Sequence, residues 1–149
     1  MKLEDEIKQD KFSSPFYKAL LNIRVTESWL SNRLNQTLKP FCLSQEQYNV
    51  LRILKGQYPK PSSLQLITER MVNRMSNATR LVEKLRQSGL VSRKECASNR
   101  RKVDITLTKE GLEILEQIRP KLDSTLDDMQ RLSEGEAEQL NLLLDKMRS

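Results

Sequence analysis

The sequence predicts a mainly α-helical protein with a small β-hairpin, and three observations support this fold class. The 149 residues include only four glycines and five prolines, a composition that favours long helices. Through most of the chain, apolar residues recur every three or four positions, as they do on one face of a helix. Residues 90–107 differ, because their pattern indicates two short strands joined by a polar turn.

The first long helix is predicted for residues 14–39. Ser14 followed by Pro15 suits an N-cap with proline at the first helical position, and Pro40 ends the helix. Its apolar stripe consists of Phe16, Leu20, Ile23, Leu30, Leu34 and Leu38. A small domain cannot easily cover so long a stripe, so we expect packing against a partner subunit, with packing inside the chain as the alternative.

Two shorter helices are expected next. Ser44 and Gln47 have the spacing of a capping box, which opens a helix whose buried face is formed by Tyr48, Leu51, Ile53 and Leu54. Either Ser62 or Ser63 caps the following helix, LQLITERM. Its inward residues are predicted to be Leu64, Ile67 and Met71.

Positive charge is concentrated in residues 70–102. This segment contains ten Lys or Arg and two Glu, a net charge of +8, whereas the whole chain carries +6 and the remainder therefore −2. From residue 103 to the end, eleven acidic residues outnumber six basic ones. A localised basic segment is typical of a surface that binds a polyanion, and the acidic C-terminal part is expected to face away from it.

A helix over residues 74–88 is predicted inside the basic segment, with Asn73 as N-cap and Gly89 at its C-terminal end. Its apolar face is expected to consist of Met75, Ala78, Leu81, Val82 and Leu85. The opposite face carries Arg74, Ser76, Asn77, Thr79, Arg80 and Lys84. Arg, Asn, Ser and Thr side chains suit base edges and phosphates in a major groove, whereas the alternative is an ordinary solvated helix face.

A β-hairpin is predicted to follow that helix. Its strands are expected at 90–96 and 102–107, with a polar turn at 97–101 between them. Val103, Ile105 and Leu107 alternate toward the core, while Arg100 and Arg101 lie at the tip. Such a hairpin can reach a minor groove or the phosphate backbone, although a basic hairpin can also serve solubility.

The C-terminal part is predicted to form two helices. Thr108 caps the first, and Pro120 should kink it, because the periodicity resumes beyond it. Its apolar stripe consists of Leu112, Leu115, Ile118, Leu122, Leu126 and Met129. Ser133 and Glu136 form a second capping box, which opens a last helix with Leu140, Leu143, Leu144 and Met147 on one side.

Several classes of protein are disfavoured by composition. The chain has no His, so zinc sites and Ser-His or Cys-His catalysis are excluded, and no nucleotide-binding loop occurs. We expect neither an enzyme nor a bound metal or cofactor. Cys42 and Cys96 are too few for a disulfide framework and are expected to be free thiols. Neither a membrane span nor a secretory signal is present in the pattern, which predicts a cytoplasmic protein.

The order of elements and two motifs resemble the multiple antibiotic resistance regulator (MarR) family. Residues 89–111, GLVSRKECASNRRKVDITLTKEG, are similar to the family pattern of Gly-Leu-Val, Arg, a wing tip Asp-x-Arg, and Leu-Thr-x-x-Gly. Residues 80–85, RLVEKL, match the core of its recognition helix. The wing tip departs from the pattern, because Asn99 replaces the acid that braces the wing Arg in the family, here Arg101.

This resemblance implies a winged helix-turn-helix fold with N- and C-terminal dimerisation helices. Residues 44–108 would form the DNA-binding lobe, and residues 14–39 and 109–149 the dimerisation helices of a homodimer on a pseudo-palindromic duplex. It also implies control by a small, often aromatic molecule bound between these helices and the lobe. Trp29 and Tyr48 are candidates for that pocket, although both side chain types are more often found in a core.

The expected function is a sequence-specific, ligand-responsive transcriptional regulator, most simply a repressor. The predicted DNA contacts are Arg74, Ser76, Asn77, Thr79, Arg80, Lys84, Arg86, Arg93, Lys94, Asn99, Arg100, Arg101 and Lys102. Two alternatives remain: a protein–protein interaction module on the same scaffold, and a redox-sensing regulator that uses Cys96 beside Arg93 and Lys94.

Overall fold

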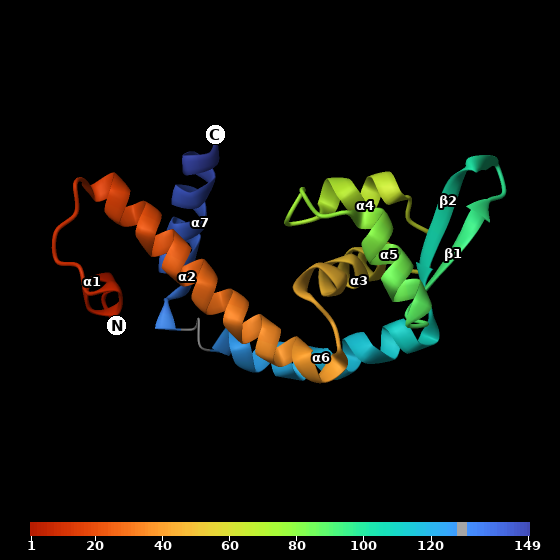
Figure 1. The fold of residues 1–149 in the computed structure, drawn as a ribbon, viewed down its shortest axis with the longest axis horizontal. Helices are drawn as coiled ribbons and strands as arrows, with labels where there is room; N and C mark the ends of the chain where they lie inside the picture. Colours follow the sequence, from red (N-terminus) through yellow and green to blue (C-terminus); the bar gives the residue numbers. More distant parts are fainter. Residues whose placement is uncertain (128–130) are drawn as a thin grey trace.

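The computed structural model describes residues 1–127 and 131–149 (Figure 1). In chain order the elements are α1 (Leu3–Ile7), α2 (Pro15–Leu38), a 3₁₀ turn (Lys39–Phe41), α3 (Gln45–Gln57), α4 (Leu64–Arg70), α5 (Ala78–Gln87), β1 (Val91–Cys96), β2 (Asn99–Leu107), α6 (Lys109–Asp127) and α7 (Glu134–Arg148). The predicted fold class, mainly helical with a small antiparallel wing, is confirmed.

The molecule has two parts that share the long helices α2 and α6. Figure 1 shows a lobe that contains α3, α4, α5 and the wing, and an arm that contains α1, the N-terminal part of α2, and α7. Helices α2 and α6 pack against each other between these parts. In the described residues, no helix combines the length and the apolar character needed to cross a membrane.

The core lies within the lobe and is built from the predicted apolar faces. Leu51 of α3, Ile67 of α4, Leu85 of α5, Ile105 of β2 and Ile118 of α6 are fully buried and belong to one cluster. Buried apolar area of this kind is the main source of stability in a small domain. Ile105 of β2 belongs to the same cluster as residues from every helix of the lobe, so the base of the β-hairpin is part of the core.

A short bridge attaches the base of the wing to the loop before α4. The Ser62 amide donates to the Ile105 carbonyl at 2.8 Å, and the Ile105 amide donates back at 2.9 Å. The helix cap is therefore Ser63, whose hydroxyl accepts from the Leu66 amide at 3.1 Å. Ser62 lies inside the bridge and is buried, whereas Ser63 is the N-cap of α4.

Three helix starts that depend on local side chains agree with the sequence. Ser14 Oγ accepts from the Tyr17 amide at 3.1 Å, and both predicted capping boxes form, at Ser44 and at Ser133. Helix α6 continues through Pro120, with Leu115 and Ile118 buried. Met129 and the side chain of Leu126, predicted on the same stripe, lie outside the described residues.

The arm has a short helix that the sequence did not predict. Helix α1 places Leu3 in a buried position, 5% exposed, and Glu4 forms an ion pair with Lys18 of α2. Five residues are too few to show a helical period, so the hydrophobic pattern could not reveal this element.

The start of the helix inside the basic segment differs from the prediction. Helix α5 begins at Ala78, and its N-cap is Asn77, not Asn73. Asn73 instead lies in a turn, where its Oδ1 accepts from the Met75 amide at 3.0 Å. The predicted burial of Met75 is therefore wrong, since this side chain is 92% exposed. Apolar spacing alone predicts one longer helix here. The chain instead forms a turn between α4 and α5, as in a helix-turn-helix unit.

The wing has a shorter turn than predicted. Only residues 97–98 form the turn, and β2 already begins at Asn99. Cys96 pairs with Asn99, whereas Glu95 pairs with Val103, so the register jumps between these two pairs. Residues 100–102 therefore have no partner across the hairpin and form a bulge of three basic residues.

Candidate nucleic-acid interface

Helix α5 has one buried and one exposed face. Ala78, Val82 and Leu85 are buried in the lobe, which fixes the rotation of the helix. Thr79, Arg80 and Lys84 are exposed, as are Arg74 and Asn77 just before the helix. The structure thus brings five of the predicted contact residues to the start and outer face of α5.

Caps at both ends define the length of α5. Asn77 Oδ1 accepts from the Arg80 amide at 3.0 Å. At the other end, Gly89 has φ +75, and the amides of Gly89 and Leu90 donate to the carbonyls of Arg86 and Leu85 at 3.0 Å each. This pair of bonds is a Schellman motif, and it turns the chain directly into β1. Because its side-chain oxygen serves as the cap, Asn77 can offer only its amide N–H groups to a ligand.

The turn before α5 is anchored at both ends. Met71 and Ala78 are buried at 4% and 6% exposure, respectively. Between them, the Val72 amide donates to Asn49 Oδ1 of α3 at 2.9 Å. Ser76, one of the predicted contacts, is half-buried, and its hydroxyl has no hydrogen-bond partner among the described residues. Its side chain is consequently less accessible than those of its exposed neighbours.

The cations on this surface differ in whether they form an ion pair within the chain. Arg86 donates to both carboxylate oxygens of Glu83, at 2.7 and 3.0 Å, and this pairing lowers the pKa of Glu83 from its usual value. By contrast, the side chains of Arg74, Arg80 and Lys84 form no ion pair within the described part of the chain. Within the described residues, Arg86 thus differs from these three cations because its charge is paired inside the chain.

The bulge of the wing presents a second set of cations. Asn99 Oδ1 accepts from the Arg101 amide at 3.0 Å, so it braces the backbone of the bulge. The side chains of Arg100, Arg101 and Lys102 are exposed. A hollow of about 810 Å³ lies between the wing and α5. It is lined by Glu83, Arg86, Arg93, Lys94, Glu95, Arg100, Arg101 and Val103.

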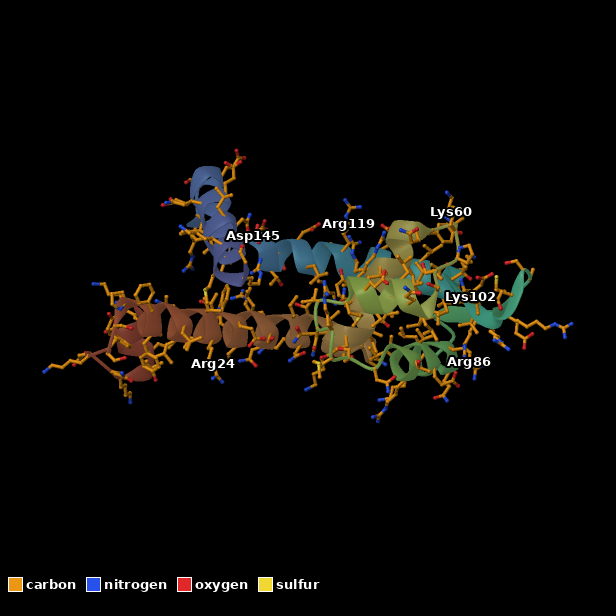
Figure 2. All side chains as sticks on the ribbon, turned by 90° about the horizontal axis from the view of Figure 1, so that it is seen from above. Arg24, Lys60, Arg86, Lys102, Arg119 and Asp145 are labelled. Carbon is orange, nitrogen blue, oxygen red and sulfur yellow. The ribbon has the colours of Figure 1, made fainter. Side chains whose placement is uncertain are left out.

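The basic surface occupies one end of the molecule. Figure 2 shows Arg86 of α5 and Lys102 of β2 at the lobe end, whereas Arg24 and Asp145 lie toward the opposite end. Within the lobe, α5 and β1 pack against each other, so the outer face of the helix and the wing belong to one contiguous surface. All the DNA-contact residues predicted from the sequence lie on these elements or on the turn before α5.

The two cysteines are free thiols, as expected. Cys96 Sγ lies 3.2 Å from the Ser98 hydroxyl, and hydrogen bonding to Ser98 lowers the pKa of this thiol. In the described residues no cluster of acidic side chains and cysteines could hold a metal ion. The redox role considered for Cys96 remains a prediction.

A pocket of about 410 Å³ lies between α2, α3 and the turn before α5. Its lining includes Leu34, Tyr48, Asn49 and Met71. Burial raises the pKa of the Tyr48 phenol above its usual value. Trp29, the other predicted pocket residue, does not line this cavity; its ring instead packs against the Arg33 guanidinium, 5.1 Å from the ring centre.

Known structures have the same fold. A MarR transcription factor from Planctomyces limnophilus is 29% identical, with a TM-score of 0.64 over 93% of this chain and 98% of that one. A complex of S. aureus MepR with DNA is 22% identical, with a TM-score of 0.76 over 92% and 97%. Bordetella bronchiseptica BpsR, whose DNA binding is regulated by 6-hydroxynicotinic acid, is 24% identical, with a TM-score of 0.70 over 85% and 96%.

The family model for the MarR family matches residues 43–103, which cover α3, α4, α5, β1 and the first half of β2. This match contains the whole turn before α5 and the basic bulge of the wing. The matched region, the order of the elements and the winged-helix fold agree with one another. Over residues 43–103 this chain is similar to the MarR family, and it has the winged-helix fold of the MarR transcription factor from Planctomyces limnophilus.

Proposed function

We propose that this protein binds double-stranded DNA in a sequence-specific manner as a homodimer and represses transcription until a small aromatic ligand binds. The observation that carries the proposal is the segregation of charge. A net charge of +8 lies in residues 70–102, which comprise the last residue of α4, the turn before α5, α5 and the wing, while the rest of the chain is net negative. A phosphate backbone is attracted to the first surface and repelled by the second.

Helix α5 is proposed to occupy the major groove. Arg80 and Lys84 are exposed on its outer face and make no ion pair within the described residues, so DNA binding breaks no existing salt bridge of theirs. Arg80 can donate two parallel bonds to a guanine edge, while the Asn77 amide and Thr79 hydroxyl suit phosphates or single base contacts. The N-terminus of α5 adds a favourable dipole for phosphate.

The wing is proposed to bind the minor groove or its phosphates. Arg100 and Arg101 lie in the bulge, away from the paired part of the hairpin, so they extend the basic surface beyond α5. The hydrogen bond from the Arg101 backbone amide to Asn99 Oδ1 braces the bulge without an acidic side chain. An uncharged brace avoids the repulsion between a carboxylate and the DNA backbone.

Arg101→Ala should weaken binding to duplex DNA and reduce the slope of log affinity against log salt concentration by about 1, because one phosphate contact is lost. Titration of a labelled duplex by fluorescence anisotropy at several salt concentrations measures both quantities. Arg119→Ala is the matched control, since it removes the same charge from an exposed site on α6 (Figure 2). Equal affinity and slope in wild type and Arg101→Ala would exclude Arg101 from the interface.

The homodimer is supported by apolar surface that the single chain leaves uncovered. Phe16 of α2 is 86% exposed, and Leu142, Leu143 and Met147 of α7 are 57–70% exposed. Apolar faces of this length on two long helices are typical of an obligate interface. The helices lie in the arm, where a partner chain can cover them without obstructing the lobe (Figure 1).

The ligand is proposed to bind the pocket between α2, α3 and the turn. Tyr48 supplies a protonated phenol, and Leu34 and Met71 supply apolar walls, a combination that suits a small aromatic ring. The pocket also contacts Asn49, whose side chain holds the turn through the Val72 amide. A bound molecule that displaces Asn49 would alter the position of the recognition surface.

A panel of phenols and aromatic carboxylates should include compounds that raise the melting temperature and weaken DNA binding together. Both effects should be smaller in Tyr48→Ala than in wild type, as measured by thermal unfolding and anisotropy. Asn32→Ala on the exposed side of α2 serves as the control, because Asn32 does not line this pocket. Equal responses in the wild type and a folded Tyr48→Ala variant would place the ligand elsewhere.

A further inference from the structure

The turn between α4 and α5 carries an apolar side chain that no role described so far explains. Met75 is 92% exposed, although the residues that bound the turn, Met71 and Ala78, are buried in the core. We propose that Met75 contacts thymine C5-methyl groups in the major groove and is a specificity-determining residue. This inference rests on the proposed DNA-binding function and extends it to an apolar contact.

The backbone of the turn holds Met75 in a defined position. The Met75 amide donates to Asn73 Oδ1 at 3.0 Å, and the Ser76 amide donates to the Asn73 carbonyl at 3.1 Å. The bond from Val72 to Asn49 ties the same turn to α3. Figure 1 shows this connection protruding from the lobe at the start of α5. The exposure of Met75 is therefore a property of an ordered turn, in a place where a base-contacting element begins.

The charges around Met75 identify the kind of partner. Arg74 precedes it directly, and Arg80 lies in the first turn of α5; both side chains are exposed and form no ion pair in the described residues. A purely apolar protein surface would leave these two cations desolvated without a counter-charge. Duplex DNA offers phosphates for the cations and, among its major-groove base edges, the thymine methyl as the apolar group.

The chemistry of methionine suits this contact. Its thioether is polarisable and its side chain is unbranched, so it can adjust to a methyl group while the backbone stays in place. A residue just before the recognition helix lies near the N-terminal end of that helix, the part that contacts base edges in helix-turn-helix proteins. Met75 would thus add a preference for thymine to the polar contacts that Arg80 and Asn77 make.

Replacement of thymine by deoxyuridine tests the inference, because it removes only the C5-methyl group. The probe is the duplex that wild type selects from a random pool, with each thymine replaced in turn. At one or more positions in each half-site, the wild-type affinity should fall about fourfold, the factor that corresponds to one buried methyl group of about 0.8 kcal/mol. Met75→Ala should bind the thymine duplex more weakly and show no difference between thymine and deoxyuridine there.

Three controls separate this contact from other causes. Met75→Leu should keep much of the methyl dependence, while Val72→Ala tests the other exposed apolar side chain of the turn, which is 91% exposed, as a competing source of the contact. The salt slope of Met75→Ala should equal that of wild type, because no charge is changed. Thermal unfolding checks that the variants are folded.

The outcomes distinguish this inference from the proposed function. If wild type binds duplex DNA with a steep salt slope but discriminates no thymine from deoxyuridine, or if Met75→Ala retains the discrimination, the assignment of Met75 is overturned while DNA binding stands. If Val72→Ala alone loses the discrimination, the contact belongs to Val72. If wild type binds no duplex at all, the proposed function and this inference are both wrong.

Discussion

Gly111→Ala should destabilise the protein by about 3 kcal/mol, the upper part of the range for overpacking, because the added methyl group has no space. A Cβ at this position would lie 2.1 Å from the backbone carbonyl oxygen of Leu90 and 3.1 Å from Leu107 Cδ2. A backbone oxygen cannot move aside as the end of a flexible side chain can. The start of α6 would have to shift away from the junction between α5 and β1.

The same junction is held by a small hydrogen-bond network. Thr108 donates its hydroxyl to the Gly89 carbonyl at 2.7 Å and its amide to the Leu90 carbonyl at 3.1 Å. The Gly111 amide in turn donates to Thr108 Oγ1 at 3.1 Å. The clash in Gly111→Ala therefore acts on the contacts that set the wing relative to α5, and we expect weaker DNA binding in addition to lower stability.

Urea unfolding at equal protein concentration measures the change in the free energy of unfolding. Gly135→Ala and Gly56→Ala are matched controls, since both residues lie in helices and an added Cβ would meet nothing within 4 Å. Each control should gain about 0.5–1 kcal/mol from the higher helix propensity of alanine. A Gly111→Ala variant as stable as these controls would show that the close approach to Leu90 does not occur.

Leu143→Glu should convert the proposed dimer into monomers and lower the affinity for a two-half-site duplex by at least about 100-fold. Leu143 is 57% exposed on α7, and the proposed interface would bury it. A carboxylate placed there without a partner loses its hydration when the subunits associate, which costs several kcal/mol. In a dimer, binding of one subunit holds the other at a high effective concentration near its own half-site, which raises the affinity about 10²–10⁴-fold. Separate monomers bind the two half-sites independently and lose this gain.

Sedimentation velocity measures the oligomeric state, and anisotropy measures the binding of whole and half sites. Asn141→Glu adds the same charge to an exposed polar position of α7 and should leave the dimer intact. For Leu143→Glu we expect the affinity for a single half-site to change little, because α5 and the wing are distant from α7 (Figure 1). A dimer that persists in Leu143→Glu would contradict the assignment of α7 to the interface.

Features with local causes could be predicted from the sequence. The caps at Ser14, Ser44 and Ser133 depend on side chains that contact amides three residues later, so short motifs were sufficient. Gly89 was recognised as a helix end for the same reason, because its positive φ is a local requirement. The mainly helical fold could be predicted because apolar residues recur at the helical period along each long helix.

Features that depend on tertiary contacts could not be predicted in this way. The spacing of Met75 and Ala78 fits one helical face, yet Asn49 of α3 and Asn73 hold the chain in a turn there, and only Ala78 is buried. The bulge at residues 100–102 reflects strand register, which the alternation of side chains does not determine at a polar tip. In both places the competing pattern was plausible, and hydrogen bonds and strand pairing that apolar spacing does not reveal decided the outcome.

In the candidate site, too, some features could be predicted from the sequence and others could not. The concentration of cations was visible in composition, but the pairing of Arg86 with Glu83 depends on rotamers that composition does not specify. Of the two aromatic residues proposed for a ligand pocket, only Tyr48 lines it. A pocket is formed by elements distant in the sequence, so residue type alone could not separate Tyr48 from Trp29.

Selection of duplexes from a random pool by the purified protein tests sequence-specific binding by a dimer. We expect enrichment of an inverted repeat whose half-sites are centred about 10–10.5 base pairs apart or a multiple of that spacing. One dimer should bind each selected duplex, with an affinity that falls steeply as salt concentration rises. Recovery of sequences no different from the starting pool, or binding that is independent of salt, would show that this protein is not a sequence-specific DNA-binding regulator.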